Sequence, residues 1–158
     1  MKKRRKSTNA NVPAKGRLRD MADQLWSIAV RSDWNWKCAV CGGTPCEAHH
    51  LVPRQHEATR YDLRNGIALC STHHQFDADL SPHQNAAGWM LWLSDNHALR
   101  CQWYNDTILY GEHRTFSGTK TANYYCDMIR CFQEYVEPDV WQKIVGVKFS
   151  KWLKEFKS

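Results

Sequence analysis

Hydrophobic side chains recur every three to four positions over residues 17–33. This spacing is that of one face of a helix. It turns Leu25, Trp26 and Ala29 toward a core, with polar residues between them. The pattern therefore predicts an amphipathic helix that stops near Asp33.

The second half of the chain carries further helical patterns. Residues 84–96 predict a short buried helix, and residues 121–136 predict a longer one that Pro138 breaks. Lysines alternate with apolar residues over 148–157, which predicts a last amphipathic helix. Residues 99–116 mix aromatic and polar residues without a clean period, so strand and irregular structure both stay open there.

Shorter apolar runs lie between these helical segments. Residues 47–53 and 67–69 each suit a short strand, and the polar segment 54–64 between them suits a loop. Residues 71–79 contain no helix breaker and predict a helix with Ser71 as its N-cap. Short strands among several helices predict an α+β fold.

Positive charge gathers at the start of this chain of 158 residues. Eight of the 22 Lys and Arg residues precede Asp20, so 14 remain against all 16 acidic residues in the rest. We predict that residues 1–16 form a flexible basic arm that neutralises phosphates; a solubility tail is the alternative. Neither a secretory signal nor a membrane span is expected, because no long apolar run follows the charges. The arm residues predicted to contact DNA are Lys2, Lys3, Arg4, Arg5 and Lys6.

Cysteine and histidine spacing points to zinc. Cys38-x2-Cys41 is followed 28 residues later by Cys70-x2-His73, and two such pairs complete a tetrahedral site. A site closed by four protein ligands has a structural role. The alternatives are buried free thiols with a surface histidine, or Cys46 as a substitute ligand.

Further histidines are left over after zinc ligation. Neighbouring residues on a strand face opposite sides, so His49 and His50 serve different purposes. We predict that His49 and His74 bind a second cation, most of whose coordination positions stay open, and that this cation stabilises a phosphorane. His50 would take a proton from the attacking water. Asn65 would accept the Nδ1 proton of His50 through its side-chain or backbone carbonyl. The alternative is that the adjacent histidines are a surface accident.

The segment from Cys38 to His74 resembles the HNH endonucleases, which have the ββα-metal (His-Me finger) fold. The resemblance rests on the two zinc knuckles, on Glu47-x-His49-His50, and on Asn65-Gly66 before an apolar strand. It covers about residues 36–83, under a third of the chain. It implies a zinc-stapled ββα core surrounded by N- and C-terminal helices. The corresponding division is an arm over 1–16, the core with its preceding helix over 17–83, and a mostly helical extension over 84–158.

The resemblance also implies roles for individual residues. Family members cut phosphodiester bonds with one divalent ion, here Mg²⁺ or Mn²⁺ (with Ni²⁺ or Zn²⁺ as stand-ins in a crystal), and leave 5′-phosphate and 3′-hydroxyl ends. The implied roles are His50, Asn65, Glu47 and Arg54 as catalytic residues, His49 and His74 as ligands of the catalytic ion, Cys38, Cys41, Cys70 and His73 as zinc ligands, and Arg60 and Arg64 as DNA contacts.

Two positions depart from the family or lack a role in it. Some relatives carry a third metal ligand four residues after the final histidine, where this chain has Ala78. Asp77 beside it is a substitute with a less favourable helical direction. His83 stands in a Ser-Pro-His stretch similar to one in some phage-type HNH proteins, and we predict a capping or packing role for it.

The sequence thus predicts a small metal-dependent HNH DNA endonuclease. Its size and trailing aromatic segment resemble phage-type HNH proteins, which implies phage or prophage genome processing in the cytoplasm of a bacterial host. The partners expected are DNA and a larger phage protein, with no membrane. A junction-specific recombination nuclease, a catalytically silent zinc-binding DNA module and a protein-interaction adaptor stay open as alternatives.

Overall fold

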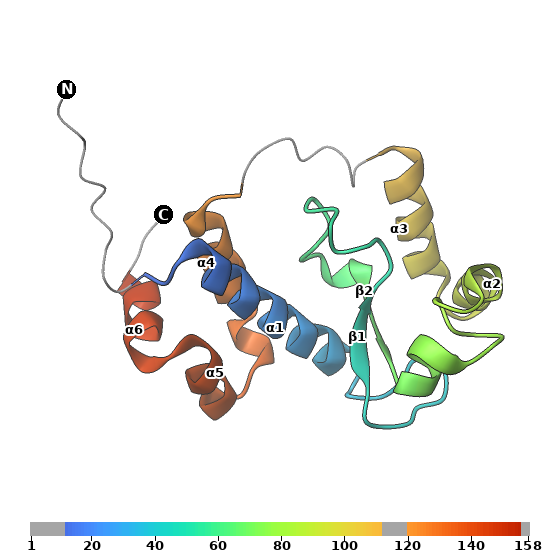
Figure 1. The fold of residues 1–158 in the computed structure, drawn as a ribbon, viewed down its shortest axis with the longest axis horizontal. Coiled ribbons are helices and arrows are strands. Elements are labelled where there is room, and N and C mark those ends of the chain that lie inside the picture. The colour runs from blue at the N-terminus through green and yellow to red at the C-terminus, as the bar shows by residue number, and fades with distance from the viewer. Residues whose placement is uncertain (1–11, 112–119, 156–158) are drawn as a thin grey trace. The chain divides into compact units, whose positions relative to one another are not determined.

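The computed structural model describes residues 12–111 and 120–155, so the arm residues Lys2–Lys6 lie outside the described part. The described chain is mostly helical with one two-stranded antiparallel sheet, which confirms the predicted α+β class (Figure 1). Its elements are α1 (Lys15–Asp33), β1 (Glu47–His50), β2 (Gly66–Leu69), α2 (Ala86–Asn96), α3 (Ala98–Leu109), α4 (Ala122–Cys131), α5 (Pro138–Val145) and α6 (Val147–Glu155). Single turns are formed by η1 (Leu63–Asn65), η2 (Thr72–Phe76) and η4 (Gln133–Tyr135).

The first strand is shorter than predicted, whereas the second begins one residue earlier than predicted. β1 pairs with β2 from Glu47 opposite Leu69 to His50 opposite Gly66. The predicted strand ran on to residue 53, but the backbone of Val52 bonds instead to the Asn65 side chain. The chain therefore leaves the sheet directly after His50.

Gly66 allows α1 to approach the sheet closely. A side chain at this position would collide with Val30 and press on Trp26, both from the last turns of α1. All four residues of β2 are buried. The apolar side chains of β2 pack in a core together with residues of α2 and α3. The buried residues of this core are Cys38, Ile67, Leu69, Trp89, Leu93 and Cys101.

The chain divides into two compact units, residues 26–119 and residues 1–25 with 120–158. In the second unit the first part of α1 and helices α4 to α6 bury an apolar core. Trp141 in α5 donates from Nε1 to the Ser150 hydroxyl in α6 at 2.9 Å, which gives this buried indole its partner. The predicted division after residues 16 and 83, and the surrounding of the core by helices, stay predictions. The buried apolar residues of this unit include Leu18, Leu25, Ile129, Phe149 and Leu153.

Most helices lie where the pattern put them. The predicted helices over 17–33, 84–96 and 148–157 correspond to α1, α2 and α6. The predicted helix over 121–136 is shorter, because α4 ends at Cys131 and a separate turn follows. No helix of the described residues is long and apolar enough to cross a membrane.

Three predictions of local structure need correction or completion. The undecided segment 99–116 is helical over α3 as far as Leu109. Pro138 does not merely break a helix but begins α5, since proline fits the first helical turn, where its missing N–H costs nothing. The predicted α-helix over 71–79 is one π-turn, Thr72–Phe76, and Ser71 makes no side-chain cap.

Candidate metal centres and active site

The four predicted zinc ligands converge on one point in unit 26–119. Cys38 Sγ lies 3.7 Å from His73 Nδ1, Cys70 Sγ lies 3.2 Å from the same atom, and Cys41 Sγ lies 3.9 Å from Cys70 Sγ. Zn–S bonds of about 2.3 Å in a tetrahedron put neighbouring sulfurs about 3.8 Å apart. The spacing of these donors therefore fits one tetrahedral zinc ion, and all three cysteines are free thiols.

The knuckle around Cys38 is preorganised for a thiolate. The backbone N–H of Gly42 donates to the Cys38 carbonyl, and Gly42 adopts a positive φ of 71° that suits glycine. Burial raises the pKa of the Cys38 thiol, but backbone N–H groups of Cys70, Cys41 and Val40 outweigh it and lower the pKa to about 7. A thiol near this pKa ionises readily, which favours metal binding.

Asp77 belongs to the zinc cluster and not to the second site. Its Oδ2 lies 3.9 Å from Nε2 of His73, and its Oδ1 accepts the backbone N–H groups of Asp79 and Leu80. Those two N–H groups lower the pKa of Asp77. The expectation of Asp77 as a substitute ligand for the second ion is therefore wrong in this geometry; the carboxylate instead faces the outer nitrogen of a zinc-ligand histidine, a common arrangement in metal sites.

The second cluster forms on the face of the sheet that His49 occupies. His49 Nδ1 lies 3.0 Å from His74 Nε2. Bonds of about 2.1 Å at right angles put neighbouring ligand atoms of an octahedral ion about 3.0 Å apart. The same distance suits a hydrogen bond between the two imidazoles, so the surrounding groups decide what the pair can hold.

Glu47 fixes the proton of His74. Its Oε2 lies 2.9 Å from His74 Nδ1. A carboxylate accepts, so Nδ1 carries the hydrogen and Nε2 directs its lone pair toward His49. This carboxylate–histidine pair is the usual support of a metal-bound imidazole.

His83 joins the same cluster, although we predicted only a capping or packing role for it. Its ring lies 5.3 Å from that of His49 and 5.0 Å from that of His74, and ligand atoms of all three lie within 4.8 Å of one another. The buried Ser81 hydroxyl donates to the His74 carbonyl and accepts the His83 backbone N–H. Because three imidazoles converge on one point, a bound cation accounts for their arrangement better than a hydrogen bond between two of them.

The environment of His49 keeps it neutral. Burial, together with the neighbouring imidazoles of His74, His83 and His50, lowers the pKa of His49 to about 3. A neutral imidazole offers the lone pair that a metal needs, whereas a protonated one would repel the ion.

His50 faces away from this cluster, as alternation along a strand requires. Its ring stacks on Trp26 of α1, with ring centres 3.7 Å apart and planes within 12°, and Trp26 is held by a bond from its Nε1 to the Asp62 carbonyl. Nε2 of His50 lies 3.0 Å from the Arg60 carbonyl. A carbonyl only accepts, so Nε2 carries the hydrogen and Nδ1 is the basic nitrogen of the neutral ring.

Asn65 has a different set of partners from the one predicted. Its amide accepts the N–H of Val52 at 2.6 Å and donates to the carbonyls of Val52 and Thr59, each at 3.0 Å, while its own carbonyl accepts the N–H of Leu51. The proposed bond to His50 is therefore corrected: the fully buried Asn65 holds the loop whose Arg60 carbonyl meets His50.

The basic residues of the loop differ in exposure. Arg54 is exposed and lies four residues after the end of β1. Arg60 is only 8% exposed and bonds the Arg54 carbonyl and Glu57, which does not fit its predicted DNA contact. Arg64 has a side chain 68% exposed, paired with Asp62.

Comparison with known proteins agrees with the geometry. Residues 38–80 match the model of a family described as HNH endonuclease. The match includes both clusters except His83, and it confirms the resemblance to that family over this segment. The family implies nuclease activity in general, with DNA as the substrate. No curated protein and no solved structure gave a significant match to the chain.

Proposed function

We propose that this chain is a metal-dependent DNA endonuclease whose reacting groups gather around His49, His50 and His74. One observation carries the proposal: His49 Nδ1 and His74 Nε2 approach to 3.0 Å while the adjacent His50 points to the other face, against Trp26. A site that only stabilises the fold has no need of a separate, differently oriented imidazole beside it. The zinc cluster supplies the rigid frame.

The catalytic ion would be held by His49, His74 and His83, with Glu47 orienting His74. When bound, a divalent ion neutralises charge on the scissile phosphate and on the leaving oxygen. Few protein ligands leave room for water and substrate, which suits Mg²⁺ or Mn²⁺. The neutral state of His49 supports this use of the cluster.

His50 would act as the general base. Its Nδ1 removes a proton from water as the water oxygen forms a bond to phosphorus, and the bond from phosphorus to the 3′ oxygen breaks. Products with 5′-phosphate and 3′-hydroxyl ends follow, the leaving oxygen taking its proton from solvent. Trp26 and the Arg60 carbonyl hold the ring, and Arg54 binds the phosphate.

The test is cleavage of supercoiled plasmid by the zinc-loaded chain with added Mg²⁺ or Mn²⁺. His50→Ala removes the base and is expected to lower the rate by roughly 10²- to 10⁴-fold. His56→Ala is the matched control, since His56 lies outside both histidine clusters in the described part of the chain, and it is expected to cut like the parent.

Equal cutting by parent and His50→Ala would contradict the mechanism. Absence of cutting by the parent in either ion, with Mn²⁺ still bound, would favour the silent zinc-binding DNA module instead. Comparing branched and linear duplexes distinguishes a junction nuclease. The phage role and a larger phage partner remain predictions from the resemblance.

A further inference from the structure

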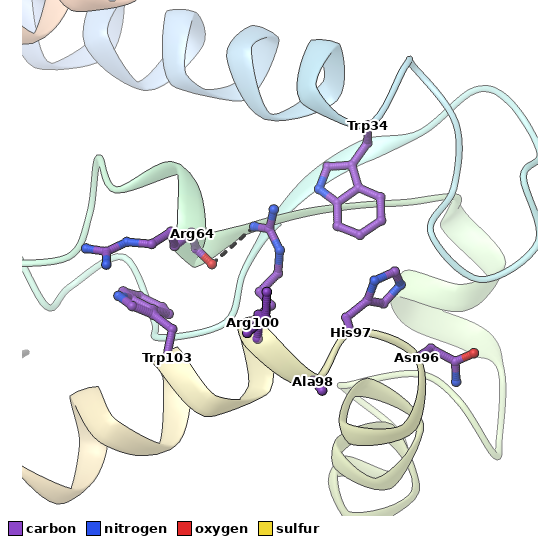
Figure 2. Close-up of a pocket in the computed structure, with 8 residues that line it drawn as sticks. Trp34, Arg64, Asn96, His97, Ala98, Arg100 and Trp103 are labelled. Atoms are coloured by element: carbon purple, nitrogen blue, oxygen red, sulfur yellow. Dashed lines mark hydrogen bonds between the residues drawn. The ribbon is translucent and has the colours of Figure 1, made fainter.

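A concave site in the part of the chain that the structure describes is lined by no residue of either metal cluster. It is a pocket of about 480 Å³, within the range of small-molecule sites. Figure 2 shows Arg100 rising from α3 between Trp34, which follows α1, and Arg64, in the turn before β2. The residues that matter are Trp34, Arg64, Asn96, His97, Arg100 and Trp103.

Two guanidinium–indole pairs build its walls. The Arg64 guanidinium lies 5.4 Å from the centre of the Trp103 ring, and that of Arg100 lies 5.1 Å from the Trp34 ring. Arg100 also donates to the backbone carbonyls of Leu63, Arg64 and Gly66. These bonds hold the aromatic walls in place before any ligand arrives, which lowers the entropy cost of binding.

The charges of the pocket cancel. Arg64 pairs with Asp62 at 2.6 Å, and Arg100 pairs with Asp33 at 3.3 Å. Each guanidinium therefore has its own carboxylate, and a free phosphate gains little by entering. Flat aromatic walls without net charge favour an uncharged planar ligand.

Polar atoms in the pocket suit the edge of such a ring. Asn96 uses its Nδ2 on the Trp92 carbonyl, which leaves Oδ1 as an acceptor. Burial and the charge of Arg100 lower the pKa of His97, so its ring is neutral.

The pocket shares its backbone with the candidate active site. Gly66, whose carbonyl accepts from Arg100, pairs with His50 across the sheet. Asn65, which holds the loop beside His50, lies between Arg64 and Gly66. The turn that forms one side of the pocket is therefore adjacent to His50 along the backbone of the sheet.

We propose that this pocket binds an unpaired nucleobase of the nucleic acid that the enzyme cuts, by stacking on Trp103 and Trp34. The inference rests on the proposed function. It makes strand ends, bulges or locally opened duplex better substrates than fully paired DNA. A paired base is stacked in the helix and cannot enter.

Photo-crosslinking tests the contact directly. The zinc-loaded full chain is irradiated with a single-stranded oligonucleotide carrying one 5-iodouracil, without added divalent ion so that no cutting is needed. Mass spectrometry is expected to find the crosslink on Trp34 or Trp103. A hairpin with the same label in a base pair is expected to give several-fold less product at these positions.

Affinity provides the second measurement. Trp103→Ala is expected to weaken binding of the single-stranded oligonucleotide by about fivefold or more, the usual effect of losing one base–aromatic stack. Tyr104→Ala is the matched control, a half-buried aromatic on the same helix that does not line the pocket, and it is expected to bind like the parent. Far-UV circular dichroism checks that both variants fold.

Equal weakening by Trp103→Ala and Tyr104→Ala, or crosslinks confined to other peptides, would overturn the proposal. So would equal binding of paired and unpaired labels. The outcome is separable from that of the proposed function: base binding with an uncleaved plasmid leaves this pocket standing, and cleavage without base binding leaves the endonuclease standing.

Discussion

At the scale of single residues, the main feature is that adjacent histidines make different contacts. His49 and His50 face opposite sides of a strand, and His73 and His74 serve different clusters. A strand alternates by 180° and a helical turn rotates successive side chains into different directions, so adjacent imidazoles separate without any loop between them. Two candidate metal sites thereby fit into one short segment.

His83 offers the sharpest test of the second cluster. Removal of one of three imidazoles by His83→Ala is expected to weaken Mn²⁺ binding by roughly tenfold or more, since supporting groups alone are worth 10–100-fold. Isothermal titration calorimetry on the zinc-loaded chain measures this. Gln84→Ala, at the next exposed position, is the control; identical Mn²⁺ affinities for both variants would remove His83 from the ligand set.

His97 gives a pH-dependent prediction. Burial between Trp34 and Trp92, and the nearby charge of Arg100, lower its pKa in the folded chain. Below the ordinary pKa of about 6.5 the unfolded chain binds a proton that the folded chain resists, so folding stability falls as pH decreases through that value. His97→Gln is expected to flatten this fall between pH 7.5 and 5.5 in urea denaturation. An unchanged pH dependence would contradict it.

Residue types and spacing predicted most members of the two candidate metal clusters from the sequence, and one member was missed. The zinc quartet, His49 and His74 were predictable because their spacing is that of metal ligands. His83 was not, because it lies nine residues after His74, and the Ser81 hydroxyl bonds to the backbone of both residues. Trp26 looked like an ordinary core residue, since nothing in a helical pattern shows which indole a distant strand will stack on.

At the scale of elements, the chain turns into a loop after His50, where the sequence predicted that the first strand would continue to residue 53. Asn65 closes this loop with three side-chain hydrogen bonds to backbone atoms. The sequence predicted a loop over 54–64 and the turn signal Asn65-Gly66, but it did not show that the Asn65 side chain would hold that loop. Similarly, the π-turn over Thr72–Phe76 cannot be told from an α-helix by periodicity, because a single turn has no period to read.

Loss of the Asn65 amide is expected to destabilise this unit. Asn65→Ala leaves the buried N–H and carbonyl of Val52 and the carbonyl of Thr59 without their partner, at about 1–3 kcal/mol for each unsatisfied group and less where water enters. We expect the free energy of unfolding to fall by about 2–4 kcal/mol in urea titration. Asn105→Ala, at an exposed position of α3, serves as control and is expected to change it by less than about 0.5 kcal/mol.

The zinc knuckles join elements that have little else to hold them. β1 and β2 have four residues each, and an isolated two-stranded sheet is at best marginally stable. Chelation of zinc, or Cys70→Ser, is therefore expected to lower the melting temperature of the chain, as followed by near-UV circular dichroism of the tryptophans. Cys131→Ser is the control, since this exposed thiol lies outside the cluster. An unaltered melting curve after complete zinc removal would show that the cluster is not structural.

At the scale of the whole molecule, charge and candidate chemistry belong to different units. Unit 26–119, which contains both metal clusters, carries seven Lys and Arg against nine Asp and Glu. The other unit, residues 1–25 and 120–158, carries the remaining 15 Lys and Arg against seven Asp and Glu, and it therefore accounts for the positive net charge of the chain. A unit without net positive charge attracts phosphates weakly by itself, so we expect the other unit to supply most of the affinity for DNA.

The five basic residues Lys2–Lys6 are the densest part of that charge. Each phosphate contact that they make contributes about −0.9 to the slope of log affinity against log salt on duplex DNA. Replacement of all five by Gln is expected to reduce the slope by up to about 4.5 and to weaken binding at low salt uniformly across sequences. Fluorescence anisotropy at several salt concentrations, without added divalent ion, measures this. Replacement of Lys148, Lys151 and Lys154 of α6 by Gln is the comparison; if that variant alone reduced the slope, the phosphate contacts would lie on α6 and not on the arm.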